Sequence, residues 1–124
     1  MPKKPNLKPV CWVAPSYNEL MAFPRDVQHA IGVALMMAQA GDKAPSAKPL
    51  KGFKGAGVLE VVDDHDGDTY RAVYTVRFAG VVYLLHAFQK KSKRGISTPK
   101  HVIELIRDRL KTAEQDYRKQ KAGK

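Results

Sequence analysis

The stretch TYRAVYTVRFAGVVYLLHAFQKKSKRGI, residues 69–96, decides the fold of this chain. Two runs of β-branched and aromatic residues, 70–78 and 81–88, are separated only by Ala79 and Gly80. This spacing predicts two antiparallel strands joined by a two-residue β-hairpin turn. The second run passes directly into the cationic segment 89–95. The chain is therefore expected to place a basic loop at the end of a central strand.

If the two runs pair across this turn, Arg71 lies opposite Phe88 and diagonal to His86, close to Lys90 and Lys91. Because side chains alternate along a strand, eight of them are expected to share one sheet face. These are Arg71, Val73, Thr75, Arg77, Val82, Leu84, His86 and Phe88.

A cationic cluster with a histidine suits a phosphodiester. Guanidinium and ammonium groups neutralise phosphate oxygens, and imidazole can transfer a proton near neutral pH. The alternative is that Arg71 and Arg77 extend from an exposed sheet face and that His86 is a hydrogen-bonded core histidine. The spacing alone leaves both interpretations open.

Composition points to a polyanionic partner. The chain has 124 residues, enough for one domain with its own core. It carries 22 lysines and arginines against 12 acidic residues, a net charge of +10. Such a charge favours nucleic acid, the ribosome or an acidic protein as the partner. No apolar run has transmembrane length, so no membrane partner is expected. Cys11 is the single cysteine, which indicates a cytoplasmic protein without an intrachain disulfide.

The N-terminal half predicts one strand and two helices. Residues 1–9 are interpreted as a flexible basic arm, and residues 10–13 as a strand with Trp12 in the core. Ser16 and Glu19 form an S-x-x-E capping box that is expected to open a short helix. Pro24 breaks that helix and starts a second, which Gly41 ends. Met36 and Met37 are interpreted as core side chains, with a binding face as the alternative.

Two loops resemble ligand sites without matching their templates. Residues 42–57 mix glycine, proline and lysine, but Val58 and Leu59 follow the last glycine where a phosphate loop needs Lys and Ser or Thr. The acidic run 63–68 fails the calcium-loop spacing and is expected to be a turn after a strand at 58–62. The four histidines lack metal-ligand spacing. We therefore expect no metal and no cofactor.

The C-terminal part predicts a helix. Thr98 is the expected N-cap, Pro99 lies in the first turn, and an apolar stripe runs on to Tyr117. This helix is expected to pack on the sheet and to leave the other sheet face partly open. The fold class is thus α+β, with a small antiparallel or mixed sheet of about four strands, two N-terminal helices and one C-terminal helix. The domain is expected to span residues 10–117, followed by a basic tail at 118–124.

With these elements in order, residues 10–117 resemble the RelE/ParE superfamily of bacterial toxins, and within it the HigB-like, phage-derived branch. Several short motifs carry the resemblance. They are Phe23-Pro24, Lys48-Pro-Leu-Lys-Gly52, Tyr70-Arg71-Ala-Val-Tyr74, Leu85-His86-Ala-Phe-Gln-Lys90-Lys91 and Thr98-Pro99. The resemblance implies a RelE-like fold and the toxin of a type II toxin–antitoxin pair. Such a toxin would enter the ribosomal A site and cut mRNA as a metal-independent endoribonuclease.

The resemblance also implies roles for individual residues. Arg71 would stabilise charge on the phosphorane, and Lys90 and Lys91 would hold the phosphate or assist proton transfer. Nuclease members often carry a tyrosine or histidine near the end of the last strand, where this chain has Phe88, so His86 or a lysine would supply the proton. The expected catalytic residues are Arg71, His86, Lys90 and Lys91. The expected substrate-binding residues are Lys51, Lys54, Arg77, Lys93 and Arg94.

Two other functions fit the same charge pattern. One is a non-catalytic toxin of the same superfamily that inhibits DNA gyrase by binding. The other is a non-enzymatic nucleic-acid-binding protein, for which positive charge alone suffices. In the toxin interpretations the partner is a cognate antitoxin, often a helix-turn-helix protein, that covers the basic face.

Overall fold

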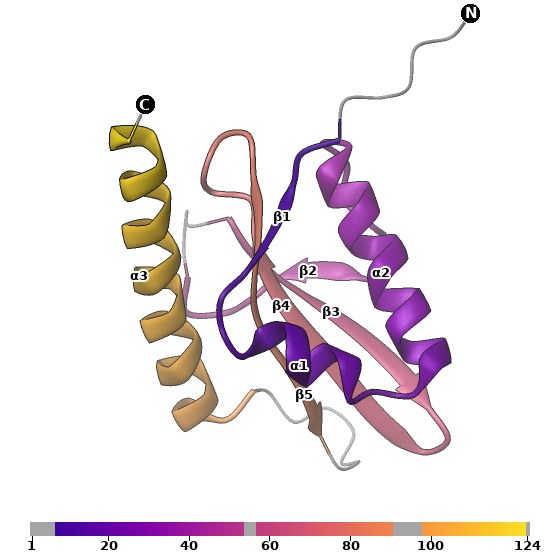
Figure 1. Cartoon of the computed structure of the whole chain (residues 1–124). Helices are drawn as coiled ribbons and strands as arrows, with labels where there is room; N and C mark the ends of the chain where they lie inside the picture. Colours follow the sequence, from indigo (N-terminus) through magenta and orange to yellow (C-terminus); the bar gives the residue numbers. More distant parts are fainter. Residues whose placement is uncertain (1–6, 54–56, 91–97, 124) are drawn as a thin grey trace, which may run out of the picture.

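The computed structural model describes residues 7–53, 57–90 and 98–123. Within them the chain forms five strands and three helices (Figure 1). In chain order these are β1 (Val10–Trp12), α1 (Ser16–Met21), α2 (Arg25–Gln39), β2 (Ala47–Pro49), β3 (Val58–His65), β4 (Asp68–Thr75), β5 (Val82–Lys90) and α3 (Lys100–Ala122). None of the described helices is both long enough and apolar enough to cross a membrane.

The strands make one mixed sheet in the order β1-β5-β4-β3-β2. β1 runs parallel to β5, and the remaining pairs are antiparallel. The α+β class and the placement of the helices are as predicted. The sheet has five strands rather than about four, because Ala47–Pro49, inside the expected loop, pairs with β3.

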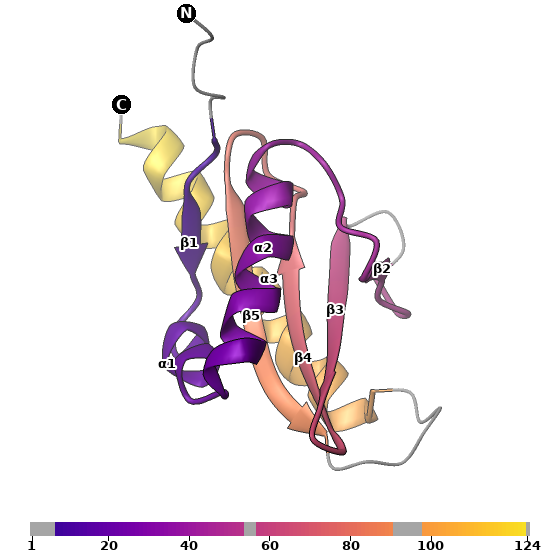
Figure 2. The same ribbon diagram turned by 90° about the vertical axis from the view of Figure 1, so that its right-hand side faces the viewer.

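Both faces of the sheet are covered, so the expected open face is wrong. Figure 2 shows α2 on one side of the sheet and α3 on the other. Each helix brings its own apolar stripe to a separate cluster. Against α2 lie Ala72, Tyr74, Val82 and Leu84, and against Ile106, Leu110 and Ala113 of α3 lie Val73, Tyr83 and Leu85. The strands β4 and β5 are apolar on both faces, which is why each face needs a helix.

The central hairpin differs from the prediction in its turn and in its register. Residues 76–81 join β4 to β5, so the connection is not a two-residue turn. Arg71 pairs with Phe88 as expected, but a bulge after Val73 makes Tyr74 pair with Leu84. An extra residue in one strand shifts the alternation from that point on. Val82 and Leu84 therefore face α2 rather than sharing the face of Arg71.

The turn between β3 and β4 is the two-residue hairpin. Asp66 and Gly67 both have positive φ, +50° and +82°, the geometry of a type I′ turn. The acidic run is thus the end of β3 and a tight turn. β3 reaches His65, three residues further than predicted.

Two predicted helix caps and two predicted core residues, Trp12 and Met36, are wrong. α1 begins at Ser16 itself, whose hydroxyl donates to the Leu84 carbonyl oxygen instead of capping the helix. α3 begins at Lys100, and Thr98 bonds elsewhere. Trp12 is 40% exposed and packs edge-on against Tyr17, and Met36 is 56% exposed. For Ser16 and Thr98, a contact with a distant part of the chain outweighs the local signal.

Candidate functional site

Arg71 lies near the start of β4, on the sheet face that α3 covers. Its Nη1 donates to Oε1 of Glu60 on β3 at 3.0 Å, and both side chains are largely buried, with exposed fractions of 15% and 12%. Thr98, just before α3, donates from Oγ1 to the second carboxylate oxygen of Glu60 at 3.0 Å. One carboxylate thus connects a strand arginine to the segment that enters α3.

Lys90 completes this group at the end of β5. It pairs with Thr69, two residues along the ladder from the Arg71–Phe88 pair, and so lies on the same face as Arg71. Burial and the Arg71 guanidinium lower the pKa of Lys90, while Glu60 acts in the opposite direction. We name Glu60, Arg71, Lys90 and Thr98 the Arg71 cluster. It brings two cations and one carboxylate together at one end of the sheet.

The guanidinium of Arg71 has hydrogen-bonding capacity to spare. Its Nε is buried and has no hydrogen-bond partner among the residues that the structure describes. A guanidinium presents five N–H donors in a fixed plane that matches the oxygens of a phosphate. Arg71 is therefore anchored by Glu60 through Nη1, while its Nε makes no hydrogen bond to the described residues.

His86 belongs to a different group. Its Nδ1 lies 2.9 Å from Oε1 of Glu19 on α1 and 3.0 Å from Nη1 of Arg109 on α3. Arg109 donates from Nη1 and Nη2 to the two Glu19 oxygens at 2.8 and 3.1 Å, and from Nη1 to the Leu85 carbonyl oxygen at 3.0 Å. We name Glu19, His86 and Arg109 the Arg109 brace. It ties α1, β5 and α3 together.

The brace shifts the proton affinities of both titratable members. Burial lowers the pKa of His86, Arg109 adds to the lowering, and Glu19 opposes it. Burial tends to raise the pKa of Glu19, but hydrogen bonds from Arg109 and His86 outweigh this and leave it lowered. The His86 ring also stacks on Phe88, with centroids 4.9 Å apart. His86 is 8% exposed, so its placement favours the core-histidine alternative over a catalytic role.

The other two predicted site residues that the structure describes, Arg77 and Lys51, lie away from the Arg71 cluster. Arg77 follows the far end of β4, where its guanidinium carbon lies 5.7 Å from the centroid of the Phe78 ring. Lys51 follows β2 in a turn beside α3, where Arg107 donates to the Gly52 carbonyl oxygen. The other four predicted residues, Lys54, Lys91, Lys93 and Arg94, lie outside the described residues.

Sequence reasoning missed four members of these groups, including Glu19, which was interpreted only as part of a capping box. Glu60 is the polar residue inside the apolar run 58–62. A carboxylate in this strand, next to the predicted strand that carries Arg71, could have indicated an ion pair between them. Thr98 was interpreted as a cap, and nothing local marked Arg109. Among the described residues, no three His, Cys, Asp or Glu side chains are placed to hold a metal ion together.

Comparisons with known proteins give a match to one family and to solved structures. The model of the family described as phage-derived protein Gp49-like matches residues 18–111. The fold is similar to a chain in the crystal structure of the toxin–antitoxin complex RelBE2 from Mycobacterium tuberculosis. That likeness has 17% sequence identity and a TM-score of 0.47, and covers 73% of this chain and all of the other. No curated protein matches the sequence significantly.

Proposed function

The chain belongs to the family of phage-derived Gp49-like proteins, and from this premise we propose that it is the toxin of a type II toxin–antitoxin pair and cuts mRNA on the ribosome. The observation that carries the proposal is the Arg71 cluster, in which Arg71 and Lys90 lie on one sheet face with Glu60 beside them. The net charge of +10 supports an RNA-rich target.

The cluster holds the groups that RNA cleavage without a metal requires. In this proposal Glu60 accepts the proton of the ribose 2′-hydroxyl, and the 2′-oxygen attacks the adjacent phosphorus. Arg71 binds a non-bridging oxygen through its spare N–H groups and stabilises the charge on the phosphorane. The bond from phosphorus to the 5′-oxygen then breaks, and Lys90 donates a proton to that oxygen. The products are a 2′,3′-cyclic phosphate and a 5′-hydroxyl.

The lowered pKa of Lys90 supports its assignment as the acid. An ordinary ammonium is a weak acid at neutral pH, and burial together with a neighbouring guanidinium makes it give up its proton more readily. Lys90 replaces His86 in this role, since His86 is committed to the Arg109 brace. Lys91, Lys93, Arg94 and Lys54 stay predicted contacts to the RNA backbone, and Lys51 extends that set from the turn after β2.

The ribosome and an antitoxin are the proposed partners, and the cytoplasm is the proposed location. Steering by a strongly basic surface brings a small protein quickly to a polyanion, and this attraction weakens as salt increases. An antitoxin that covers the Arg71 cluster would have to meet the same positive charge with acidic side chains.

The test is to induce the wild type and three variants in bacterial cells and to map mRNA 5′ ends. Arg71→Ala and Lys90→Met remove the two cations, and Arg77→Ala removes a matched arginine at the opposite end of the sheet. We expect each of the first two variants to lose about 100-fold in cleavage and Arg77→Ala to retain it. Purified ribosomes with a defined mRNA should give fragments that end in a cyclic phosphate.

Other outcomes would favour the alternatives. Growth arrest with intact transcripts and induction of a DNA-damage response would point to gyrase inhibition. Normal growth with salt-dependent RNA binding would point to a non-enzymatic nucleic-acid-binding protein. Equal loss of cleavage in Arg77→Ala and Arg71→Ala would show that overall charge, and not the cluster, carries the activity.

A further inference from the structure

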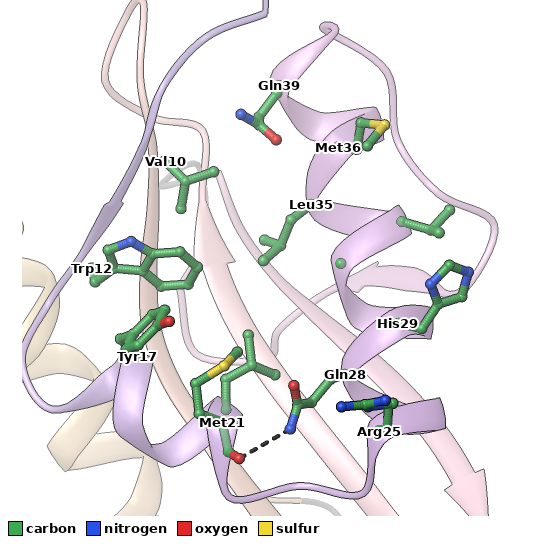
Figure 3. A pocket seen from close by; sticks show the side chains of 13 residues that line it. Val10, Trp12, Tyr17, Met21, Arg25, Gln28, His29, Leu35, Met36 and Gln39 are labelled. Atoms are coloured by element: carbon green, nitrogen blue, oxygen red, sulfur yellow. Dashed lines mark hydrogen bonds between the residues drawn. The ribbon is translucent and has the colours of Figure 1, made fainter.

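A second concave site lies on the other side of the sheet, between β1, α1 and α2. It has a volume of about 680 Å³ and is lined mainly by apolar side chains (Figure 3). Five of the seven large hydrophobic side chains that are exposed in the described part of the chain line this groove. They are Trp12, Tyr17, Met21, Val33 and Met36, with exposed fractions between 40% and 56%. Exposed apolar groups that gather in one place, rather than lying scattered, are typical of a binding surface.

The groove is separate from the Arg71 cluster. Its walls are α2 and the strand and helix that precede it, and α2 covers the sheet face opposite to that of α3 (Figure 2). Arg71 and Glu60 lie on the α3 face. A ligand in the groove would therefore leave the Arg71 cluster untouched.

Side-chain hydrogen bonds connect the walls of the groove at both of its ends. At one end Gln39 of α2 donates from Nε2 to the Lys8 carbonyl oxygen at 2.7 Å. At the other, Gln28 donates from Nε2 to the carbonyl oxygens of Met21 and Phe23 at 3.0 and 2.8 Å, the first of which Figure 3 shows. These bonds fix α2 relative to the walls facing it. A preformed groove binds more tightly because little ordering accompanies binding.

The shape of the groove fits a helix. Its α2 wall runs from Arg25 to Gln39 in steps of three and four residues, which is one face of the helix along its whole length. At 1.5 Å per residue this wall is roughly 21 Å long, the length of a helix of about 14 residues. Gly32 lies midway, and a Cβ at this position would meet nothing within 4 Å. The missing side chain leaves room for a large apolar residue of the ligand.

The charge of the groove selects an acidic ligand. Arg25 is the one always-charged side chain among its lining residues, His29 adds a second charge when protonated, and no carboxylate lines it. The chain as a whole carries +10, so a second copy would bring a like charge to the same surface. An acidic partner is attracted both by Arg25 in the groove and by the net positive charge of the whole chain.

We propose that the groove between β1, α1 and α2 is the docking site for an acidic amphipathic helix of a protein partner, with its apolar face on Trp12, Val33 and Met36 and its carboxylates toward Arg25. Docking of this kind places residues at i, i+3, i+4 and i+7 of the ligand in the groove. The methionines at the rim adapt to the shape of the bound side chains. The proposal does not depend on whether the Arg71 cluster cuts RNA.

Trp12 makes the proposal directly measurable, since it is the single tryptophan of the chain and lines the groove. The probe is a synthetic helix of about 14 residues with leucines at i, i+3, i+4 and i+7 and glutamate and alanine elsewhere. Its addition to the full chain should shift Trp12 emission to shorter wavelengths as the ring leaves water. A peptide with lysine in place of glutamate and one with the leucines scrambled are the controls. Each should bind at least about tenfold more weakly.

Protein variants locate the binding on the groove. Met36→Glu places a charge among the exposed apolar groups and should weaken binding at least about tenfold. Leu105→Glu changes an exposed apolar residue on α3, away from the groove, and should leave binding unchanged. Val33→Glu serves as a second groove variant, and circular dichroism checks that all three fold. Arg71→Ala should bind the peptide as the wild type does.

Four results would overturn the proposal. The first is an unchanged Trp12 spectrum at saturating acidic peptide. The second is equal binding of the lysine peptide or the scrambled peptide. The third is full binding to Met36→Glu and Val33→Glu. The fourth is a concentration-dependent dimer in sedimentation that Met36→Glu abolishes, because the groove would then hold a second copy of the chain.

Discussion

The Arg109 brace and the Arg71 cluster are both built from a carboxylate and an arginine, yet they use their hydrogen bonds differently. Arg109 donates to both oxygens of Glu19 and to the Leu85 carbonyl oxygen, and Oε1 of Glu19 also accepts from the Ala87 N–H and lies 2.9 Å from His86 Nδ1. Arg71 donates to Glu60 through Nη1, and its buried Nε has no partner among the described residues. The first group is saturated and the second has a donor left over.

In our proposal, this difference separates a group that supports the fold from a group that acts on RNA. A saturated buried network gains nothing from a ligand, and any change to it leaves a buried charge without a partner. An arginine with a spare N–H in a partly covered site can bind an anionic oxygen without losing its anchor. The same two residue types therefore hold the helices to the sheet in one place and, in our proposal, present a guanidinium to substrate in the other.

The largest effect on stability is expected for Arg109→Ala. It leaves Glu19 and His86 without their shared partner and should lower the free energy of unfolding by about 3 kcal/mol. Arg71→Ala should cost about 1 kcal/mol, since Glu60 keeps its bond from Thr98. Urea titrations of both variants measure the difference. A double-mutant cycle of Arg109→Ala with Glu19→Gln should show strong coupling. Equal costs for the two arginines would remove the distinction between the groups.

Glu60→Gln should show the reverse pattern, a large effect on activity with little on stability. The amide oxygen still accepts from Arg71, and the amide nitrogen can donate to the Thr98 hydroxyl, but the group can no longer take a proton. Ribosome-dependent cleavage should fall about 100-fold, equivalent to about 2.7 kcal/mol in the barrier. Primer extension on a defined mRNA measures the rate. Glu19→Gln is the matched control, and it should lower stability while leaving the rate per folded molecule unchanged. Full cleavage by Glu60→Gln would exclude Glu60 as the base.

Acid should weaken the fold through His86 before it does so through Glu19. Because the folded pKa of His86 is lowered, the unfolded chain takes up a proton near pH 6.5 while the folded chain does not. This contribution to stability is present above pH 6.5 and is lost as the pH falls below it. The lowered pKa of Glu19 contributes only above about pH 4.5 and is lost on further acidification. Urea midpoints between pH 7 and pH 5.5 should therefore decrease in the wild type.

His86→Asn isolates this effect, since its amide keeps a donor near the Nδ1 position and cannot titrate. Its urea midpoint should change less between pH 7 and pH 5.5 than that of the wild type. The other histidines remain as an internal control in both proteins. A fall of the same size in His86→Asn would place the titrating group outside the Arg109 brace.

The fold could be predicted from the sequence because its main signals are local. Alternating and helical apolar patterns predicted the sheet and all three helices, and the Arg71–Phe88 register followed from pairing the two apolar runs. The bulge after Val73 could not be predicted, since it depends on fitting one strand between two helical layers. Its consequence is that Val82 and Leu84 changed face while His86 stayed with Arg71.

The candidate site was only half predictable for a similar reason. Arg71 and Lys90 could be paired from strand spacing alone. Glu60 enters from the neighbouring strand, and Thr98 bonds to it across 38 positions in the chain. Arg109 reaches Glu19 across 90 positions. No local sequence pattern predicts which carboxylate an arginine will contact in the folded protein. The structure is therefore needed to tell Arg109, whose hydrogen bonds are saturated, from Arg71, which keeps an unpaired donor among the described residues.

The smallest effect is expected for the pair of Arg118 and Glu114, one turn apart on the surface of α3. Its 2.8 Å contact is as short as that of Arg109 with Glu19, but Arg118 is 76% exposed. Water and salt screen such a pair, and holding two long side chains costs entropy, so Arg118→Ala should change the free energy of unfolding by less than about 0.5 kcal/mol. Urea titration in low and high salt measures it. If Arg71→Ala proved as mild as Arg118→Ala in both stability and cleavage, the Glu60–Arg71 pair would behave as an ordinary solvated contact, because burial and not distance is what separates Arg118 from Arg71 and Arg109.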